Sequence, residues 1–141
     1  MKKILVSFLI MITLALPTFA TNWISVSSDK KTFIDLDSIA EANEYRNGYK
    51  CYLFWRKDLN TGSPREKEME RLCKQRIWYS MNMYEVCLDT KEFCLIYSVN
   101  YNLKGQVIDH YNYRYYSTWK SIIPDTTGEF IYEIIKNIVS E

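Results

Sequence analysis

Apolar and polar residues alternate along most of the chain after residue 22, which predicts a protein built largely from β-strands. Residues 28–30 and Asn47-Gly48 have the composition of turns between such strands. Residues 37–42 lack the alternation and are predicted to form a single helical turn with a polar cap. The six predicted strands cover residues 23–27, 31–36, 49–57, 80–88, 92–101 and 106–116.

The fourth and fifth predicted strands form a hairpin. If residues 90–91 are its loop, Val86 lies opposite Leu95 on an apolar face. The same face then carries Tyr84, Leu88, Phe93 and Tyr97. The other face carries Glu85, Ser98 and Asn100. One apolar and one mixed face is typical of an antiparallel sheet that is covered on one side.

A helix is predicted at residues 64–78, inserted between the third and fourth strands. Ser63 is the expected N-cap, Pro64 takes the first helical position, and Glu66 has capping-box spacing. The charged residues of this segment are expected to form the solvated face of the helix. The inward face is predicted to contain Met69, Leu72, Cys73, Arg76 and Ile77.

A second helix is predicted at residues 127–139, with Thr126 as its N-cap and Glu129 in capping-box spacing. Its apolar stripe combines two rows, Phe130, Ile134 and Ile138 beside Ile131, Ile135 and Val139. A membrane-surface helix usually carries more Lys or Arg than the single Lys136 found here, so packing on the sheet is favoured. The predicted fold is α+β: one antiparallel sheet of about six strands with an inserted helix and a C-terminal helix packed on it.

The first twenty residues have the pattern of a secretory signal peptide. Lys2 and Lys3 precede an apolar run at residues 4–16, which is short for a membrane span, and Ala20 ends a cleavage pattern. The alternative is a retained N-terminal anchor, which the short run and the cleavage pattern disfavour. Cleavage after Ala20 would leave one exported domain at residues 21–141.

The charge of the exported domain is close to neutral. The chain has 18 Lys and Arg residues against 17 Asp and Glu residues, and cleavage would remove Lys2 and Lys3. This balance argues against nucleic acid as a partner, because nucleic-acid-binding faces are strongly basic.

Four cysteines in an exported chain predict disulfides. They allow three pairings, of which Cys87–Cys94 across the hairpin and Cys51–Cys73 from strand to helix are predicted here. A metal site is not expected, because the sequence has no Cys-x-x-Cys pair and His110 is the only histidine.

No catalytic set is evident in the sequence. His110 alternates with Asp109 and Tyr111 along a predicted strand, so those side chains face away from it. No Gly-x-Ser-x-Gly motif is present, and four glycines provide no phosphate-binding loop. The chain is therefore predicted to be a protein without enzymatic activity and without a cofactor.

The tyrosine-rich run at residues 111–116 is the candidate contact surface. On a strand, Tyr113 and Tyr115 would share one face, while Arg114 and Tyr116 would share the other. Tyrosine and arginine are enriched in protein interfaces, so these four residues are the predicted protein-binding site.

Several motifs in order resemble the surface-adhesin protein E-like family of bacterial exported proteins. The resemblance covers nearly the whole exported domain. It rests on Trp23, FIDLDSI at 33–39, the strand at 49–57, YEVC at 84–87, YNLKGQVID at 101–109, Trp119, Ile123-Pro124 and Gly128-Glu129.

The resemblance implies an antiparallel sheet of about six strands, a C-terminal helix, and export to the cell surface, the periplasm or the medium. It further implies binding to host extracellular-matrix or serum proteins; a second copy of the chain is a further candidate partner. Family members often end the helix in a cysteine, whereas this chain ends in NIVSE, so its disulfides must differ. The alternative function is a periplasmic accessory or inhibitor protein that acts on an envelope enzyme through the loop at 58–64.

Overall fold

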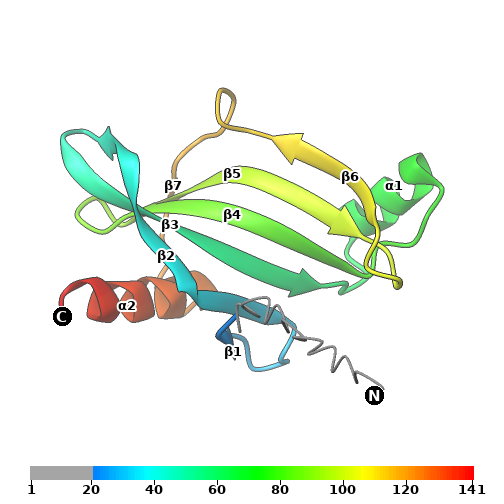
Figure 1. The fold of residues 1–141 in the computed structure, drawn as a ribbon, viewed down its shortest axis with the longest axis horizontal. Helices are drawn as coiled ribbons and strands as arrows, with labels where there is room; N and C mark the ends of the chain where they lie inside the picture. The colour runs from blue at the N-terminus through cyan, green and yellow to red at the C-terminus, as the bar shows by residue number, and fades with distance from the viewer. Residues whose placement is uncertain (1–20) are drawn as a thin grey trace, which may run out of the picture.

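The computed structural model describes residues 21–141, and the predicted signal peptide lies outside the described residues. One antiparallel sheet and two helices make up the fold (Figure 1). The elements are β1 (Trp23–Ser25), β2 (Thr32–Arg46), β3 (Tyr49–Leu59), α1 (Pro64–Cys73), β4 (Tyr79–Cys87), β5 (Glu92–Tyr101), β6 (Val107–Asn112), β7 (Lys120–Ser121) and α2 (Thr127–Val139).

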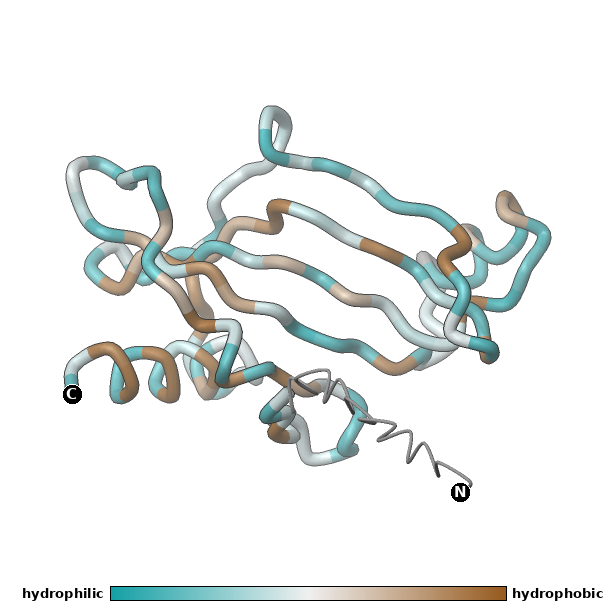
Figure 2. The backbone as a smooth tube through the Cα atoms, in the orientation of Figure 1, coloured by the Kyte–Doolittle hydropathy of each residue, from teal (hydrophilic) through white to brown (hydrophobic). Residues whose placement is uncertain are grey.

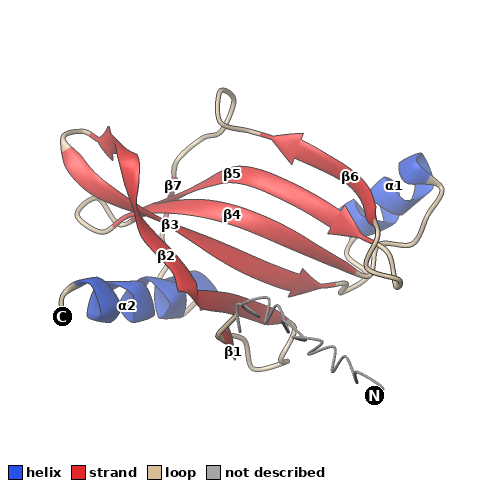
Figure 3. Ribbon diagram, in the orientation of Figure 1, coloured by secondary structure: helices blue, strands red, loops and turns tan. Residues whose placement is uncertain are grey.

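The strands follow one another through the sheet in the order β1-β2-β3-β4-β5-β6. The short strand β7 pairs with the beginning of β5, whereas β6 pairs with its second half. The two helices lie toward different ends of the sheet (Figure 3). The predicted α+β architecture, with its inserted and C-terminal helices, is therefore confirmed, with one short strand more than expected.

The helical turn predicted at residues 37–42 is wrong, because β2 continues through this segment with a bulge. The Ser38 hydroxyl donates to the Asp35 carbonyl at 2.6 Å and accepts the Trp55 backbone N–H at 2.9 Å. The Asp35 carboxylate accepts the N–H of Asp37 at 3.1 Å. These side chains satisfy backbone groups that a regular ladder would have paired, so the strand bends without becoming helical.

Helix α1 begins as predicted and ends earlier. Ser63 and Glu66 form the complete capping box, but the helix stops at Cys73, because Lys74 adopts a left-handed conformation with φ of 54°. The Glu70 carboxylate then accepts the backbone N–H of Ile77 at 3.0 Å, which turns the chain toward β4. Of the predicted inward face, Ile77 is buried, while Leu72 is exposed.

Helix α2 covers one end of the sheet. Ile131, Tyr132 and Ile135 are buried against Phe54 and Val86 in the main core. The two predicted rows are buried unequally, because Phe130 and Ile138 are exposed, while Ile134 and Val139 pack partly buried against the core. Tyr132 completes the buried stripe, and its hydroxyl donates to the Leu88 carbonyl at 3.1 Å. Figure 2 shows hydrophobic and hydrophilic residues alternating along the coil of α2.

The predicted register of the β4–β5 hairpin is wrong by two residues at its loop. The loop spans residues 88–91, so Cys87 pairs with Glu92 and Val86 with Phe93. Beyond it, Met83 pairs with Tyr97 while Tyr84 pairs with Leu95, which leaves Ile96 as a bulge. Because side chains alternate between faces, this extra residue exchanges the faces of everything that follows it in β5.

Two faces of the sheet can now be named. The helix-bearing face contains Phe54, Tyr84, Val86 and Phe93 and packs on α2. The opposite face is called the open face below, and it contains Trp55, Met83 and Tyr97. Because of the bulge, Ser98 and Asn100 lie on the helix-bearing face and Tyr97 on the open face, the reverse of the prediction.

Candidate functional site

The open face is built from side chains that strand register places side by side on β3, β4, β5 and β6. Each row crosses the four strands in order. The first row is Trp55, Met83, Tyr97 and Asn112. The second row is Lys57, Met81, Val99 and His110. The third row is Leu59, Tyr79, Tyr101 and Val107. These three rows contain no carboxylate, and Lys57 is their one permanently charged member.

The aromatic side chains of the open face hold one another in place. The rings of Tyr79 and Tyr101 stack with 4.7 Å between centroids and 9° between planes. Lys57 Nζ lies 4.5 Å from the centroid of Tyr79. Trp55 meets Tyr97 edge to face, with 6.4 Å between centroids. Such contacts restrict ring rotation before any partner arrives.

Both described helices lie on the other side of the sheet. Helix α2 packs on Phe54 and Val86, and Cys73 at the end of α1 donates a hydrogen bond to Asp109, which pairs with Asn100 on the helix-bearing face. Within residues 21–141, neither helix therefore covers the three rows of the open face. A broad set of aromatic and Met side chains on an uncovered sheet is the kind of surface on which another macromolecule can pack.

The predicted protein-binding residues do not lie on a strand, because β6 ends at Asn112. The Tyr113 carbonyl accepts the N–H of Tyr116 at 2.8 Å, so the residues between them form a tight turn. Tyr115 and Tyr116 project from it and are 85% and 86% exposed. The prediction of alternating strand faces is therefore wrong for this run, although its two last tyrosines are accessible.

Tyr113 and Arg114 point in different directions. Tyr113 lines a groove on the helix-bearing face. Arg114 forms an ion pair with Glu44 at 3.3 Å and lines a hollow together with Glu85 of β4. Because Glu85 belongs to the open face, the turn that carries Tyr115 and Tyr116 lies at the border of that face. The four predicted residues thus do not form one patch.

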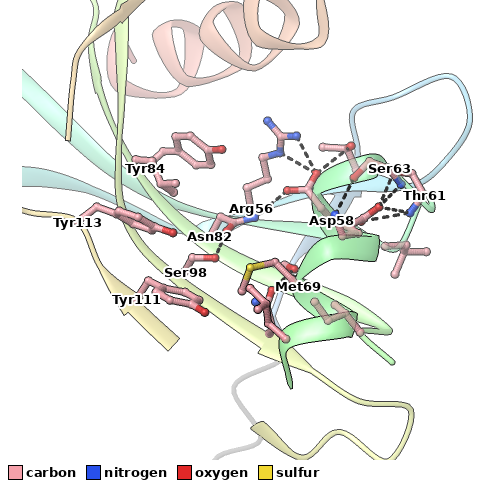
Figure 4. A pocket seen from close by; sticks show the side chains of 18 residues that line it. Arg56, Asp58, Thr61, Ser63, Met69, Asn82, Tyr84, Ser98, Tyr111 and Tyr113 are labelled. Carbon is pink, nitrogen blue, oxygen red and sulfur yellow. Dashed lines mark hydrogen bonds and ion pairs between the residues drawn. The ribbon is translucent and has the colours of Figure 1, made fainter. Parts of the chain in front are cut away.

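The groove on the helix-bearing face lies between the two helices and has a volume of about 640 Å³ (Figure 4). Its floor consists of two rows of polar side chains, whereas the part of the same sheet face that lies under α2 is apolar. The first row is Arg56, Asn82, Ser98 and Tyr111. The second row is Asp58, Ser80 and Asn100, and Asp109 continues this row beyond the residues that line the groove.

The polar side chains of the groove bind one another. Arg56 contacts the Asp58 carboxylate at 2.7 Å, and the Asn82 amide donates to the other carboxylate oxygen at 2.9 Å. The Ser98 hydroxyl donates to Asn82 at 2.7 Å. Such a network satisfies half-buried polar groups and fixes their rotamers.

Catalytic chemistry is not favoured by the titratable pairs beside the groove. The Asp109 carboxylate accepts hydrogen bonds from the Cys73 thiol and the Tyr111 hydroxyl, each at 3.0 Å. The hydrogen bond to Asp109, together with burial, raises the pKa of Cys73 to about 11. Burial and Asp109 raise the pKa of Tyr111 to about 12. A thiol with a raised pKa is a poor nucleophile, and His110 lies on the open face against Tyr97.

Two further observations concern metals and membranes. Among residues 21–141, no group of three or more His, Cys, Asp and Glu side chains is placed to hold a metal ion. The described helices are also too short or too polar to cross a bilayer.

The four cysteines are free thiols in this structure, and the predicted pairs are not brought together. Cys73 bonds Asp109 on the helix-bearing side, whereas Cys51 points to the open side of β3 beside Cys87. Cys94 pairs with Glu85, so it lies diagonal to Cys87 instead of opposite it. The Cys87–Cys94 pair was predicted from a register that lacked the longer loop, and the Cys51–Cys73 pair was predicted with both sulfurs on inward faces, whereas the two lie on opposite sides of the sheet.

The fold and these surfaces define a class of protein: a small α+β domain with both helices on one sheet face and aromatic rows on the other. No family model matches the chain, and no curated protein matches it. Among solved structures, the chain is similar to protein E of Haemophilus influenzae, with a TM-score of 0.56 and 16% identity over 82% of this chain and 84% of that chain.

A structure of crystal form II of the same Haemophilus influenzae protein gives a TM-score of 0.56 and 15% identity, over 84% of this chain and 90% of that chain. At this level of identity the likeness concerns the fold. It agrees with the architecture that the family resemblance of the sequence implies.

Proposed function

We propose that this protein is a non-catalytic, exported binding module that contacts a protein partner through its open face, with Tyr115 and Tyr116 at the border of the contact. The observation that carries the proposal is the set of three adjoining rows of mainly apolar side chains on the open face, among them one Trp, three Tyr and two Met. Tyr, Trp and Met are enriched at interface cores, where charged side chains are depleted.

The geometry of the open face lowers the cost of binding. Tyr79 and Tyr101 are already stacked, and Trp55 and Tyr97 are already in contact. Rings that are held before association lose little rotamer freedom in a complex. Lys57 adds positive charge to rows without a carboxylate, so the matching partner surface is neutral or acidic.

The partner class follows from the resemblance of the sequence to surface adhesins, which implies host extracellular-matrix or serum proteins. Export to the cell surface, the periplasm or the medium is part of the same proposal, because contact with a host protein requires it. Because fold likeness alone does not fix a ligand, the binding test below includes host proteins and envelope proteins.

The inhibitor alternative receives no support from the loop that it would use. The Glu66 carboxylate accepts the backbone N–H groups of Thr61 and Ser63, and Asn60 donates to Glu70 at 2.9 Å. These hydrogen bonds hold the loop against α1, so fewer polar groups of the loop remain to bind an enzyme. The groove is likewise a poorer protein contact than the open face, because its polar groups bind one another.

The test is a binding assay in which the chain is immobilised and exposed to purified matrix proteins, to serum, and to an envelope extract of the producing cell. Trp55→Ala with Tyr97→Ala should weaken capture roughly tenfold or more, as interface aromatics do. Tyr115→Ala with Tyr116→Ala should weaken it less. Phe130→Ala is the matched control, because Phe130 is an exposed aromatic on α2.

Circular dichroism of each variant must show an intact fold for the comparison to count. Full affinity of both double variants for every captured protein would refute the open face as the contact. Capture from the envelope extract alone would favour the periplasmic accessory role over the adhesin role.

A further inference from the structure

Cys51 and Cys87 are directly opposite each other on the neighbouring strands β3 and β4. Both side chains are 0% exposed. They form a small core cluster with Ala42, against which Leu53 and Trp119 pack. Burial raises the pKa of the Cys51 thiol to about 12, and the adjacent Cys87 thiol adds to the effect. Two thiols therefore share one closed site, which borders the buried carboxylate of Glu85.

We propose that Cys51 and Cys87 form a cross-strand disulfide when the protein folds in an oxidising compartment. Residues directly opposite in an antiparallel pair have Cα atoms about 4.5 or 5.5 Å apart. Both separations lie within the range that disulfides span, about 4.4–6.8 Å. The strands therefore need no rearrangement to accept the bond.

The other two cysteines are placed so that they stay reduced. Cys94 is diagonal to Cys87, a relation in which Cα atoms are about 7–8 Å apart, beyond the usual disulfide range. Its thiol lies 3.1 Å from the Ser117 hydroxyl, within hydrogen-bond distance. Cys73 lies on the helix-bearing side, where it bonds Asp109. The sheet itself separates Cys73 from the other three sulfurs.

The bond would form by exchange with a disulfide oxidant, either a small-molecule disulfide or the disulfide of an oxidoreductase in the export compartment. One thiolate attacks the oxidant and releases one of its sulfurs as a thiol. The second thiolate attacks the mixed disulfide, so the protein loses two protons and two electrons and the oxidant becomes two thiols. Because both side chains are closed off in the folded state, the exchange takes place before β3 and β4 are fully packed.

This inference rests on the export of the chain that the proposed function includes, but not on the contact surface, since it concerns residues outside the three rows. The test expresses the full chain for export in a bacterial host, alkylates free thiols at once, and maps peptides without reduction. The expected result is a peptide that joins Cys51 to Cys87, a mass lower by two hydrogens, and alkylated Cys73 and Cys94.

Two variants make the result specific. The exported Cys73→Ala, Cys94→Ala double variant should still have a mass two hydrogens below that of its reduced form. The Cys51→Ala, Cys87→Ala double variant should form no internal disulfide. If the second variant fails to fold, the first and the peptide map of the natural chain still decide. Four alkylated thiols in the exported protein, or a bond that involves Cys73 or Cys94, would overturn the proposal.

Discussion

The rings of Trp55 and Tyr97 meet edge to face on the open face, with 6.4 Å between centroids and 85° between planes. They come from β3 and β5, which are not neighbours, and their contact passes over Met83 of β4. The contact depends on the bulge at Ile96, because in a regular ladder Ile96 would pair with Met83 and Tyr97 would pair with Asn82 on the helix-bearing face. One inserted residue therefore shapes the binding surface.

A comparison of Phe54 with Trp55 tests the assignment of the two faces. Phe54 is 2% exposed in the main core, whereas the next residue lies on the open face. Phe54→Ala should lower the free energy of unfolding by about 3 kcal/mol or more. Trp55→Ala should cost about 1–2 kcal/mol, because it loses a partly exposed ring contact. Urea titrations of both variants would check this, and equal losses would contradict the face assignment.

The packing of α2 can be tested within one helix. Ile135 is 0% exposed, whereas Ile138 is 40% exposed. Ile135→Asp would bury a charge without a partner and should unfold the domain. Ile138→Asp, the matched control, should leave a cooperative transition. Thermal melts followed by circular dichroism give the measurement, and a folded Ile135→Asp variant would show that α2 is not part of the core.

The cap of α1 provides a third prediction, with Glu66 compared with Glu68. The Glu66 carboxylate accepts from the N–H groups of Thr61 and Ser63, while Glu68 contacts only the neighbouring Arg71 on the surface. Glu66→Ala should destabilise α1 by about 1 kcal/mol. Glu68→Ala should leave the melting temperature unchanged.

The pKa of Glu66 adds a pH dependence to this comparison. Burial would raise that pKa, but the hydrogen bonds from Ser63 and Thr61 outweigh it and hold the pKa below its ordinary value. This stabilisation is therefore present above the unfolded-state pKa and is lost as the pH falls through the folded one. The protection factors of the α1 amides, which compare their exchange with that of an unstructured chain at the same pH, should fall in acid for the natural chain and should already be low at neutral pH in the Glu66→Ala variant. Equal protection of α1 in both variants at neutral pH would contradict the role of the cap.

The sequence pattern located most elements, because their signals are local. The limits of β5 at Glu92 and Tyr101 agree with prediction, and so do the caps of both helices at Ser63 and Thr126. The alternation of side chains along a strand and the capping of a helix by a side chain both involve only a few neighbouring residues. A single sequence is therefore enough to detect them.

What the sequence could not provide was the relation between strands. The hairpin loop at residues 88–91, the bulge at Ile96 and the bend near Ser38 all depend on tertiary contacts. Ile96 itself is buried, and its carbonyl accepts the N–H of Tyr113 from the turn after β6. The three rows of the open face were missed for this reason, although the aromatic residues at 79, 97 and 101 are visible in the sequence.

The buried Glu85 provides the fourth prediction. It is 4% exposed, pairs with Leu53 and Cys94 across the sheet, and lies at the hollow that Glu44 and Arg114 also line. Burial, with the negative charge of Glu44, raises the pKa of Glu85 above its ordinary value of 4.5, and the contributions of Cys51 and Arg114 only partly oppose this. The folded state therefore holds the proton more tightly than the unfolded state does.

The sign of the resulting pH effect follows from proton linkage. Between the unfolded-state pKa and the raised folded-state pKa, the folded protein binds more protons, so the free energy of unfolding falls as the pH rises through that window. Glu85→Gln keeps the shape of the side chain and cannot ionise. The variant should be more stable than the natural chain at neutral pH. Its free energy of unfolding should also lack the decrease with rising pH that ionisation of Glu85 causes in the natural chain. Urea unfolding at a series of pH values from acid to neutral would measure both, with Glu68→Gln as the control at an exposed carboxylate outside the hollow. A Glu85→Gln variant that is less stable at neutral pH would mean that the ionised carboxylate is stabilised by the positive charge of Arg114 more than burial opposes it.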